Sequence, residues 1–508
     1  MSRYTFNPKL ETRGGRNRRL LLGVAALSAF AILSLALLGF GICLLTGGCS
    51  FGTRAPQAEP TPFVPLVTIY APQPPTAQPP AAGATPSAGD PAAVAQPPAV
   101  TQPPADAPAA TEPPAPAPTM DPRGRIEGIP DFVCPNPRPA PAGFGYGIQS
   151  NWPVGDIGLF NTIMAEQLKM DWTKAQVRWV DFEPDGRGRY ALYKWQLLDA
   201  FTADANKKGL NILFGVLDAP AWSRPRNAFP GRPDLLGPPD DYEDARVFIE
   251  KLLTRYKGCV QAIEVWNEMN LDREWTIASR QINARDYVAL LDAVVPTIRR
   301  IDPTILIVMG ALSPTGANIT EGGVMKVIDD LTYMDQFVAA GGPSRVDCIG
   351  VHLNGYNMPP DKEWNEGYND PTAKFRGPFD SPHPSWSFKS TMRLYYEKAR
   401  KPLCVTEFGW ASMDNLKRSD GTPVQGAPPG FDFALDNTEQ EQAEWIVRGF
   451  QIMRESGYVR FGIVFNLDYI QKVGGEPDQE NVSTYSITRR DGSPRPAFEA
   501  LKQMPRPR

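Results

Sequence analysis

The sequence has little of what metal, nucleotide or nucleic-acid sites require. Its 508 residues include two histidines, His352 and His383, and six cysteines without the paired spacing of a zinc site. No phosphate-binding glycine motif follows a predicted strand. The formal charge is −4, and residues 1–19 hold six basic side chains against one acidic one, so the rest of the chain is more acidic than the whole. This balance argues against nucleic acid as a ligand, and we expect no cofactor and no metal.

Two of the six cysteines, Cys43 and Cys49, lie inside or beside an apolar run near the N-terminus. The other four belong to the globular part: Cys134, Cys259, Cys348 and Cys404. The last three each lie in or directly beside a predicted strand. We therefore expect buried free thiols that pack as small hydrophobic side chains, rather than disulfides.

Residues 20–45 are almost entirely apolar, a run longer than the core of a signal peptide and long enough to span a bilayer. The basic cluster precedes this run, so the positive-inside rule places residues 1–19 in the cytoplasm and everything after the run outside. We expect a single-pass transmembrane anchor in the cell membrane. Two alternatives remain: residues 45–49 loosely resemble a lipoprotein cleavage site, and the pair Arg18-Arg19 faintly resembles a twin-arginine export signal.

Residues 46–130 are rich in proline, alanine, threonine and glutamine and poor in aromatic side chains. Such a composition buries too little apolar surface to offset the entropy lost on ordering. We expect a disordered linker, which serves either as an extended stalk or as a tether without a spacing role. The globular domain is expected at residues 131–508.

In residues 131–508, β-prone segments alternate with helix-like segments, as in a parallel sheet wrapped by helices. Eight such units in series favour a closed α/β fold, the (β/α)8 TIM barrel. The predicted strands are 143–149, 175–180, 210–217, 260–267, 305–312, 346–352, 403–407 and 461–467. The helix-like segments include 193–208, 242–256, 283–300, 324–340 and 438–456.

Two of these strands end in a glutamate, Glu268 after the fourth and Glu407 in the seventh. The chemistry of such barrels lies at the C-terminal ends of the strands. Cleavage of an acetal needs one carboxyl group to protonate the leaving oxygen and a second to attack or stabilise the sugar carbon. We therefore expect both glutamates to face each other across the barrel mouth. Glu264, earlier in the fourth strand, is expected to make a structural ion pair or hydrogen bond.

Residues 143–501 resemble the retaining glycoside hydrolases of clan A. Trp266-Asn267-Glu268 is similar to the Asn-Glu signature of the clan, and residues 406–410 are similar to its nucleophile segment. Residues 490–498 resemble the last turn and helix of glycoside hydrolase families such as 39 and 5. The resemblance implies Glu268 as acid/base and Glu407 as nucleophile. These roles require Glu268 to titrate above Glu407 in the free protein.

The same resemblance implies contacts beside the two glutamates. Asn267 would donate a hydrogen bond to the sugar 2-hydroxyl, and Arg178 would support Glu407 as a cation that keeps it ionised. The other expected substrate contacts are Trp222, His352, Tyr356 and Trp410. His352 fits a packed core histidine equally well, and strand eight lacks the tryptophan often found at its end.

Aromatic side chains of the long loop at residues 353–387, with Trp222, Trp275 and Trp410, are expected to line the substrate. We expect a membrane-anchored, extracytoplasmic retaining glycosidase that cleaves β-linked O-glycosidic bonds by double displacement. Its partner would be a carbohydrate, with no obligate protein partner. Two alternatives stay open: a non-catalytic carbohydrate-binding surface protein on a degenerate barrel, and a transglycosylase that remodels surface polysaccharide.

Overall fold

The computed structural model describes residues 121–507 except 228–234, 369 and 371–381. Eight parallel strands form its main sheet, and they run in the order β5-β4-β3-β2-β1-β10-β9-β8. Isolated parallel bridges from Val308 to Cys348 and from Leu312 to Val351 join the two ends of this order and close the barrel. The strands are β1 (Gly145–Gln149), β2 (Trp172–Arg178), β3 (Asn211–Leu217), β4 (Ala262–Val265), β5 (Leu306–Met309), β8 (Ile349–Gly355), β9 (Leu403–Trp410) and β10 (Val459–Val464). All eight predicted strands and the (β/α)8 barrel are confirmed.

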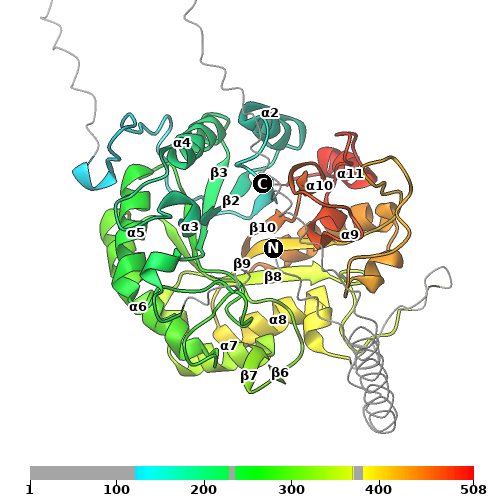
Figure 1. Cartoon of the computed structure of the whole chain (residues 1–508). Coiled ribbons are helices and arrows are strands. Elements are labelled where there is room, and N and C mark those ends of the chain that lie inside the picture. The colour runs from blue at the N-terminus through cyan, green and yellow to red at the C-terminus, as the bar shows by residue number, and fades with distance from the viewer. Residues whose placement is uncertain (1–120, 228–234, 369, 371–381, 508) are drawn as a thin grey trace, which may run out of the picture. The chain divides into compact units, whose positions relative to one another are not determined.

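Helices surround the strands as an outer ring (Figure 1). They are α2 (Ile157–Thr162), α3 (Trp179–Phe182), α4 (Leu192–Lys207), α5 (Tyr242–Arg255), α6 (Ala284–Ile301), α7 (Asp330–Ala339), α8 (Phe388–Ala399), α9 (Glu439–Ser456), α10 (Tyr469–Lys472) and α11 (Pro496–Gln503). Helix α9 shows why their ends are readable in the sequence. Thr438 and Glu441 form a capping box at its start, and Gly457 follows its end in the left-handed conformation.

One predicted helix, 324–340, is correct only in its second half. Its first residues form strand β7 (Val324–Val327), which pairs antiparallel with β6 (Ile319–Glu321). The turn between the two strands is Gly322-Gly323, and both residues have positive φ. A two-residue glycine turn of this kind selects a hairpin, so the helix begins only after the cap at Asp329.

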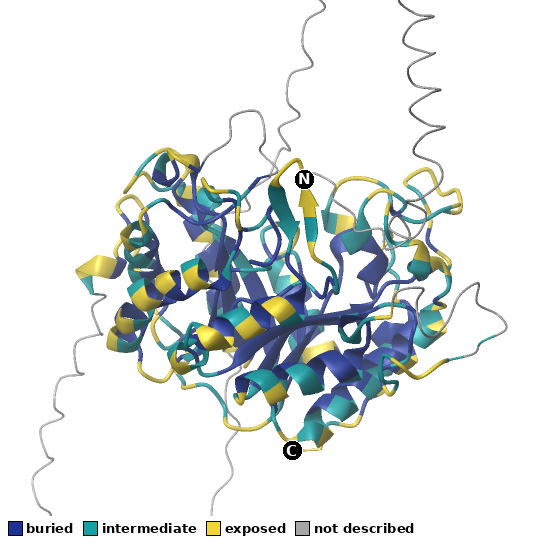
Figure 2. Cartoon of the chain, turned by 90° about the horizontal axis from the view of Figure 1, so that it is seen from below, coloured by how far each residue is buried: buried dark blue, intermediate teal, exposed yellow. Residues whose placement is uncertain are grey.

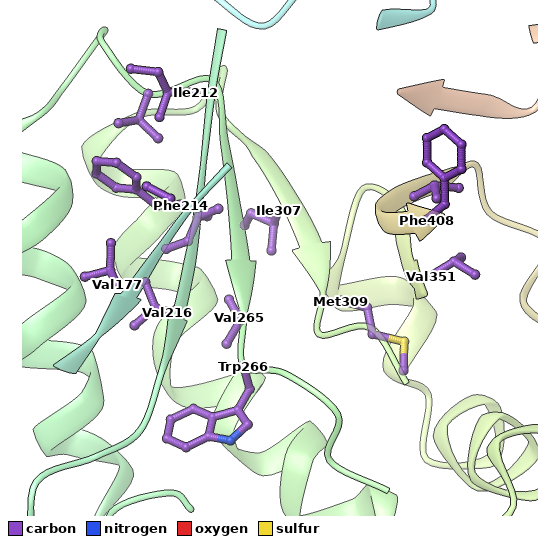
Figure 3. Packing of buried hydrophobic residues seen from close by; sticks show 14 of the residues in the cluster. Val177, Ile212, Phe214, Val216, Val265, Trp266, Ile307, Met309, Val351 and Phe408 are labelled. Carbon is purple, nitrogen blue, oxygen red and sulfur yellow. The ribbon is translucent and has the colours of Figure 1, made fainter. Parts of the chain in front are cut away.

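Two hydrophobic layers hold the barrel. The larger one lies between the strands and the helices, and Figure 3 shows part of it, from Val177 and Val216 across Val265 to Val351 and Phe408. Figure 2 shows the same division, with buried residues along the sheet and exposed ones on the outer helix faces. The smaller layer fills the barrel interior and consists of Trp172, Leu213, Ala262, Val308, Cys348, Cys404, Phe461 and Ile463.

The prediction of free thiols is wrong. Cys134 bonds to Cys259 and Cys348 bonds to Cys404, so the described residues hold two disulfides. The partners are 125 and 56 residues apart in the sequence, yet their Cα atoms lie 5.5 and 5.7 Å apart. Cys134 lies in the segment before β1, which packs beside Gly258, and Cys348 and Cys404 lie at the paired starts of β8 and β9. The pattern of strands alone does not reveal these contacts.

The Cys134–Cys259 bond is expected to contribute strongly to stability because it closes a loop of 125 residues. Replacing both cysteines by serine should lower the free energy of unfolding by about 2–5 kcal/mol. Urea unfolding of the oxidised protein and of the double variant measures this difference. Addition of reductant should bring the oxidised protein towards the variant, and an unchanged midpoint in the variant would contradict the expectation.

The globular part begins earlier than residue 131. Ile126 and Ile129 are buried, and Arg123 makes an ion pair with Glu250 of α5. Residues 121–130 therefore pack on the barrel and do not belong to the predicted linker. The rest of that linker and the predicted anchor at 20–45 lie outside the described residues. Within the described part of the chain, none of the helices combines the length and the apolar character needed to span a bilayer.

Candidate active site

Glu268 leaves the end of β4 through a strained stretch of backbone. Trp266 and Glu268 both have positive φ, 73° and 44°, a region that side chains other than glycine seldom adopt. The backbone N–H of Glu268 donates to the carbonyl of Ala311 at 2.8 Å. Asn270 bonds through its side chain to both main-chain groups of Ser313. These bonds to the loop after β5 fix the direction in which Glu268 points.

Glu407 is aimed by an extra residue in β9. Val351 pairs with Val405, but His352 pairs with Glu407, so the register shifts by one at this point. The pairing of β9 with β10 shows the same shift, because Gly462 pairs with Val405 and Val464 pairs with Phe408. A bulge turns two successive side chains to one face. Thr406 and Glu407 accordingly both contact groups inside the barrel.

His352 lies between the two glutamates. Its Nδ1 is 3.1 Å from Glu268 Oε1, and its Nε2 is 3.8 Å from Glu407 Oε2. The carboxylates thus lie on opposite sides of one imidazole ring, which keeps their separation below the ~10 Å limit for paired carboxylates of glycoside hydrolases. Their side chains retain 12% and 9% exposure, so solvent reaches both. The structure brings together the two acids that the sequence singled out.

The cation in contact with Glu407 is Lys174, not Arg178 as expected. Lys174 Nζ donates to Glu407 Oε1 at 3.0 Å. Arg178, four residues after Lys174 and at the end of β2, instead donates to Asp218 at 2.6 Å. Lys174, Gln176 and Arg178 alternate along one strand and share its inner face. Sequence reasoning missed Lys174 because it began this strand at Ala175.

Glu268 is held as a carboxylate by two cationic partners. Burial acts to raise its pKa, but the hydrogen bond and charge of His352, together with the charge of Arg273, outweigh burial and lower the pKa of Glu268 to about 2. Arg273 Nη2 lies 3.0 Å from Glu268 Oε2. Burial lowers the pKa of His352, but the charges of Glu407 and Glu268 raise it overall. The direction for Glu268 is opposite to the one expected of a proton donor.

Removing Arg273 tests this electrostatic arrangement. In an Arg273→Gln variant the carboxylate form of Glu268 loses a cation, so its pKa should rise and the proton should stay bound to higher pH. The basic limb of the pH profile of kcat/KM should then move to higher pH. Arg345→Gln, at a surface pair with Asp292, is the matched control and should leave the limb in place. A limb that moves to lower pH in Arg273→Gln would contradict the arrangement.

The remaining predicted contacts fall into different environments. The amide oxygen of Asn267 is buried and accepts no hydrogen bond from the described residues. Trp222, in the short helix Ala221–Ser223, is half-buried and donates to the carbonyl of Glu183 at 2.8 Å. The Tyr356 hydroxyl donates to the carbonyl of Pro314 at 2.8 Å.

Trp410 and Trp275 do not line the site. Trp410 is 0% exposed, and its ring stacks on Phe388 of α8. It covers Gly355, where an added Cβ would lie 1.9 Å from Trp410 Nε1. Because the bulge turns Glu407 inward, the residue three positions later faces the helices. Trp275 is also fully buried, against Trp266. The prediction that both tryptophans contact substrate is therefore wrong.

Two further ionisable groups, one near Glu268 and one near Glu407, were missed. Glu274 lies 3.5 Å from Arg273, and burial together with the charges of Asp218 and Glu268 raises the pKa of Glu274 to about 7. Tyr469 of α10 hydrogen-bonds to Gln149, and burial and the charge of Glu407 raise the pKa of Tyr469. Tyr469 stands just after the strand-eight segment that lacks the expected tryptophan.

A separate group with ligand-type atoms within 4.8 Å of one another consists of Asp329, Asp330 and His383. Asp330 already accepts hydrogen bonds from the main-chain N–H groups of Thr315 and Gly316 and from two hydroxyl groups. Four donors satisfy the lone pairs of this carboxylate. We therefore interpret the group as a structural hydrogen-bond network, which joins the loops at Thr315 and Ser385 to the start of α7.

No family model matches the sequence, and neither does any curated protein. Among solved structures, a family 39 glycoside hydrolase from the gut symbiont Bacteroides cellulosilyticus is similar, with 18% identity and a TM-score of 0.48 over 71% of this chain and 63% of that one. The family 39 enzyme from Xanthomonas axonopodis pv. citri has 15% identity and a TM-score of 0.46, over 73% of this chain and 70% of that one. A family 39 β-xylosidase from Caulobacter crescentus has 16% identity and a TM-score of 0.45, over 73% of each chain. The chain spans less than two thirds of the first of these structures.

Proposed function

We propose that the barrel is a retaining glycoside hydrolase that cleaves β-linked O-glycosidic bonds with Glu407 as nucleophile and Glu268 as acid/base. The observation that carries the proposal is the placement of both carboxylates on opposite nitrogens of the His352 ring, each with some exposure to solvent. They come from strand ends far apart in the sequence, where (β/α)8 enzymes carry their chemistry. An acid pair closer than ~10 Å meets the requirement for acetal cleavage, and its exact separation decides between single and double displacement.

In the first step, Glu407 attacks the anomeric carbon, the bond to the leaving oxygen breaks, and that oxygen takes a proton from Glu268. In the second step, Glu268 takes a proton from water, the water oxygen attacks the same carbon, and Glu407 is released. Glu268 needs a proton source because its own pKa is low. His352 supplies it across the 3.1 Å contact, so the pair holds the proton jointly.

A screen of the full-length chain against aryl β-glycosides and against β-glucan, xylan and mannan tests the activity. Release of new reducing ends by the wild-type chain, and not by a Glu268→Gln/Glu407→Gln double variant, is the expected result. Binding of a polymer without release would identify a carbohydrate-binding protein, and longer products in the presence of acceptor sugars would identify a transglycosylase. Either outcome would overturn the hydrolase.

The stereochemistry of the first product tests double displacement. Two successive displacements return the starting configuration, so the anomer formed first should be β, as seen by proton NMR before mutarotation. An α product formed first would mean single displacement through water, and Glu407 would then be a base.

We propose further that residues 20–45 anchor the chain in the cell membrane with residues 1–19 in the cytoplasm and the barrel outside. Two disulfides in the barrel support its placement in an oxidising compartment. If residues 20–45 anchor the chain, it should sediment with membranes and resist extraction by high salt. Because the barrel would lie outside, protease added to intact cells should reach it. Recovery of the uncleaved chain in the soluble fraction would overturn the anchor.

A further inference from the structure

A chain of buried charges lies beneath the two glutamates of the site. Lys174 Nζ is 3.0 Å from Glu264 Oε2 on one side and 3.0 Å from Glu407 Oε1 on the other. The side chains of Lys174 and Glu264 each retain 1% exposure. The chain of charges thus crosses the interior from β4 through β2 to β9. Glu264 makes the ion pair predicted for it, and its partner is the lysine that also contacts Glu407.

The end of this chain away from Glu407 is fixed. Glu264 Oε1 accepts hydrogen bonds from the Thr406 hydroxyl at 2.7 Å and from the Ala311 N–H at 3.1 Å. Gly215 of β3 lies beside the pair, since a Cβ there would lie 3.3 Å from Lys174 Cε and 3.4 Å from Glu264 Oε2. Glu264 therefore determines where the ammonium group sits, and the ammonium group determines where one oxygen of Glu407 sits.

Stability alone does not account for these charges. The interior layer below them is apolar, from Trp172 and Leu213 to Phe461 and Ile463. Continuing that apolar packing upward would avoid the desolvation of a lysine and a glutamate, and buried ion pairs are often no more stable than apolar side chains of similar volume. The feature that an apolar layer could not reproduce is a cation in contact with Glu407.

We propose that Lys174, anchored by Glu264, is a positioning residue that holds Glu407 ionised and in a single orientation for attack on the anomeric carbon. Lys174 has the role that was expected of Arg178. Its positive charge is divided between two carboxylates, those of Glu264 and Glu407. The proposal rests on the proposed function of Glu407 as nucleophile. The titratable groups around Glu407 are Lys174 from β2, Glu264 and Glu268 from β4 and the loop after it, His352 from β8, Tyr469 from α10 and Tyr485 at the end of the short helix Asn481–Tyr485.

Two near-isosteric variants should move the pH profile in opposite directions. Lys174→Met removes the cation, so ionisation of Glu407 becomes less favourable and the acidic limb of kcat/KM should move to higher pH. Glu264→Gln removes the second anion beside Lys174, so the ammonium group stabilises the ionised form of Glu407 more strongly. The acidic limb of kcat/KM should then move to lower pH. Arg255→Met is the control: it removes a fully buried cation paired with Asp199 outside the site and should leave the limb unchanged.

Limbs that stay in place, or that move in the same direction in both variants, would overturn the proposal. Should Lys174→Met fail to fold, Glu264→Gln alone still decides, because a purely structural glutamate would lower the melting temperature without moving the limb. Crystal structures provide a readout independent of activity. In Lys174→Met the Glu407 carboxylate should leave its wild-type place. A carboxylate that keeps its place would overturn the positioning role whether or not the chain cleaves glycosides, whereas a wild-type chain without activity would overturn only the proposed function.

Discussion

Replacing Glu407 by glutamine is expected to lower kcat for glycoside hydrolysis by a factor on the order of 10⁴ or more. The amide matches the carboxylate in shape but cannot form a stable glycosyl ester, and it leaves the ammonium group of Lys174 with one anionic partner in place of two. Initial rates with an aryl β-glycoside that the wild-type chain cleaves measure the loss. Glu397→Gln, at an exposed helical pair with Arg393, is the matched control and should keep the wild-type rate.

Azide separates the role of Glu407 from that of Glu268. In Glu407→Ala a small anion can take the place of the missing nucleophile and attack from the same side, so the product should be an α-glycosyl azide. In Glu268→Ala the glycosyl-enzyme still forms with an activated leaving group, and azide then attacks it to give a β-glycosyl azide. The reverse pattern would exchange the two assignments.

Replacing Glu268 by glutamine is expected to cost about 10²–10⁴ in kcat/KM for glycosides with poor leaving groups, since general acid catalysis is worth this much. The loss should be far smaller for a leaving group that needs no proton, such as dinitrophenolate. Rates measured across a series of aryl glycosides of increasing leaving-group pKa give this dependence directly. The variant should show a much steeper fall along the series than the wild-type chain.

Near-full activity of Glu268→Gln towards poor leaving groups would show that another group donates the proton. Glu274 is then the next residue to test, because it lies beside Arg273 and its pKa is raised to about 7. Glu274→Gln in the same leaving-group series distinguishes the two carboxyl groups. A flat dependence in Glu268→Gln combined with a steep one in Glu274→Gln would move the acid role to Glu274.

The strands were predictable because each is a short apolar, β-prone segment followed by a helix with local start and stop signals. Thr438 with Glu441, and Gly457 at the other end of α9, act within a few residues of the bonds they make. The segment 324–340 failed for an equally local reason, since Gly322-Gly323 is a hairpin signal that outweighed the helix-like pattern after it. The disulfides failed for a different reason. Cys134 meets Cys259 because the segment before β1 packs there, and Cys348 meets Cys404 because β8 and β9 pair in this register.

In the site, Glu268 and Glu407 were predictable from their place at strand ends. The partner of Glu407 was not, because choosing between Lys174 and Arg178 requires knowing how deep along β2 the opposing side chain reaches. Trp410 was misplaced because one extra residue in β9 reverses the faces of the side chains that follow it. A shift of one residue in a strand cannot be read from composition or alternation.

The sequence by itself determined the eight-fold alternation, the strand ends and the two acids, since these depend on signals between residues close along the chain. Only the tertiary structure decided which cation contacts Glu407, how His352 lies between the carboxylates, which tryptophans are buried in the core and which cysteines are bonded. The contacts of Glu407 and His352 depend on strands brought together in the closed barrel, and the burial of Trp410 depends on the register shift inside β9. The disulfides depend on the pairing of β8 with β9 and on the packing of the segment before β1. The electrostatics of the site follow from those contacts, because the energy of a buried charge is set by the groups that replace its water.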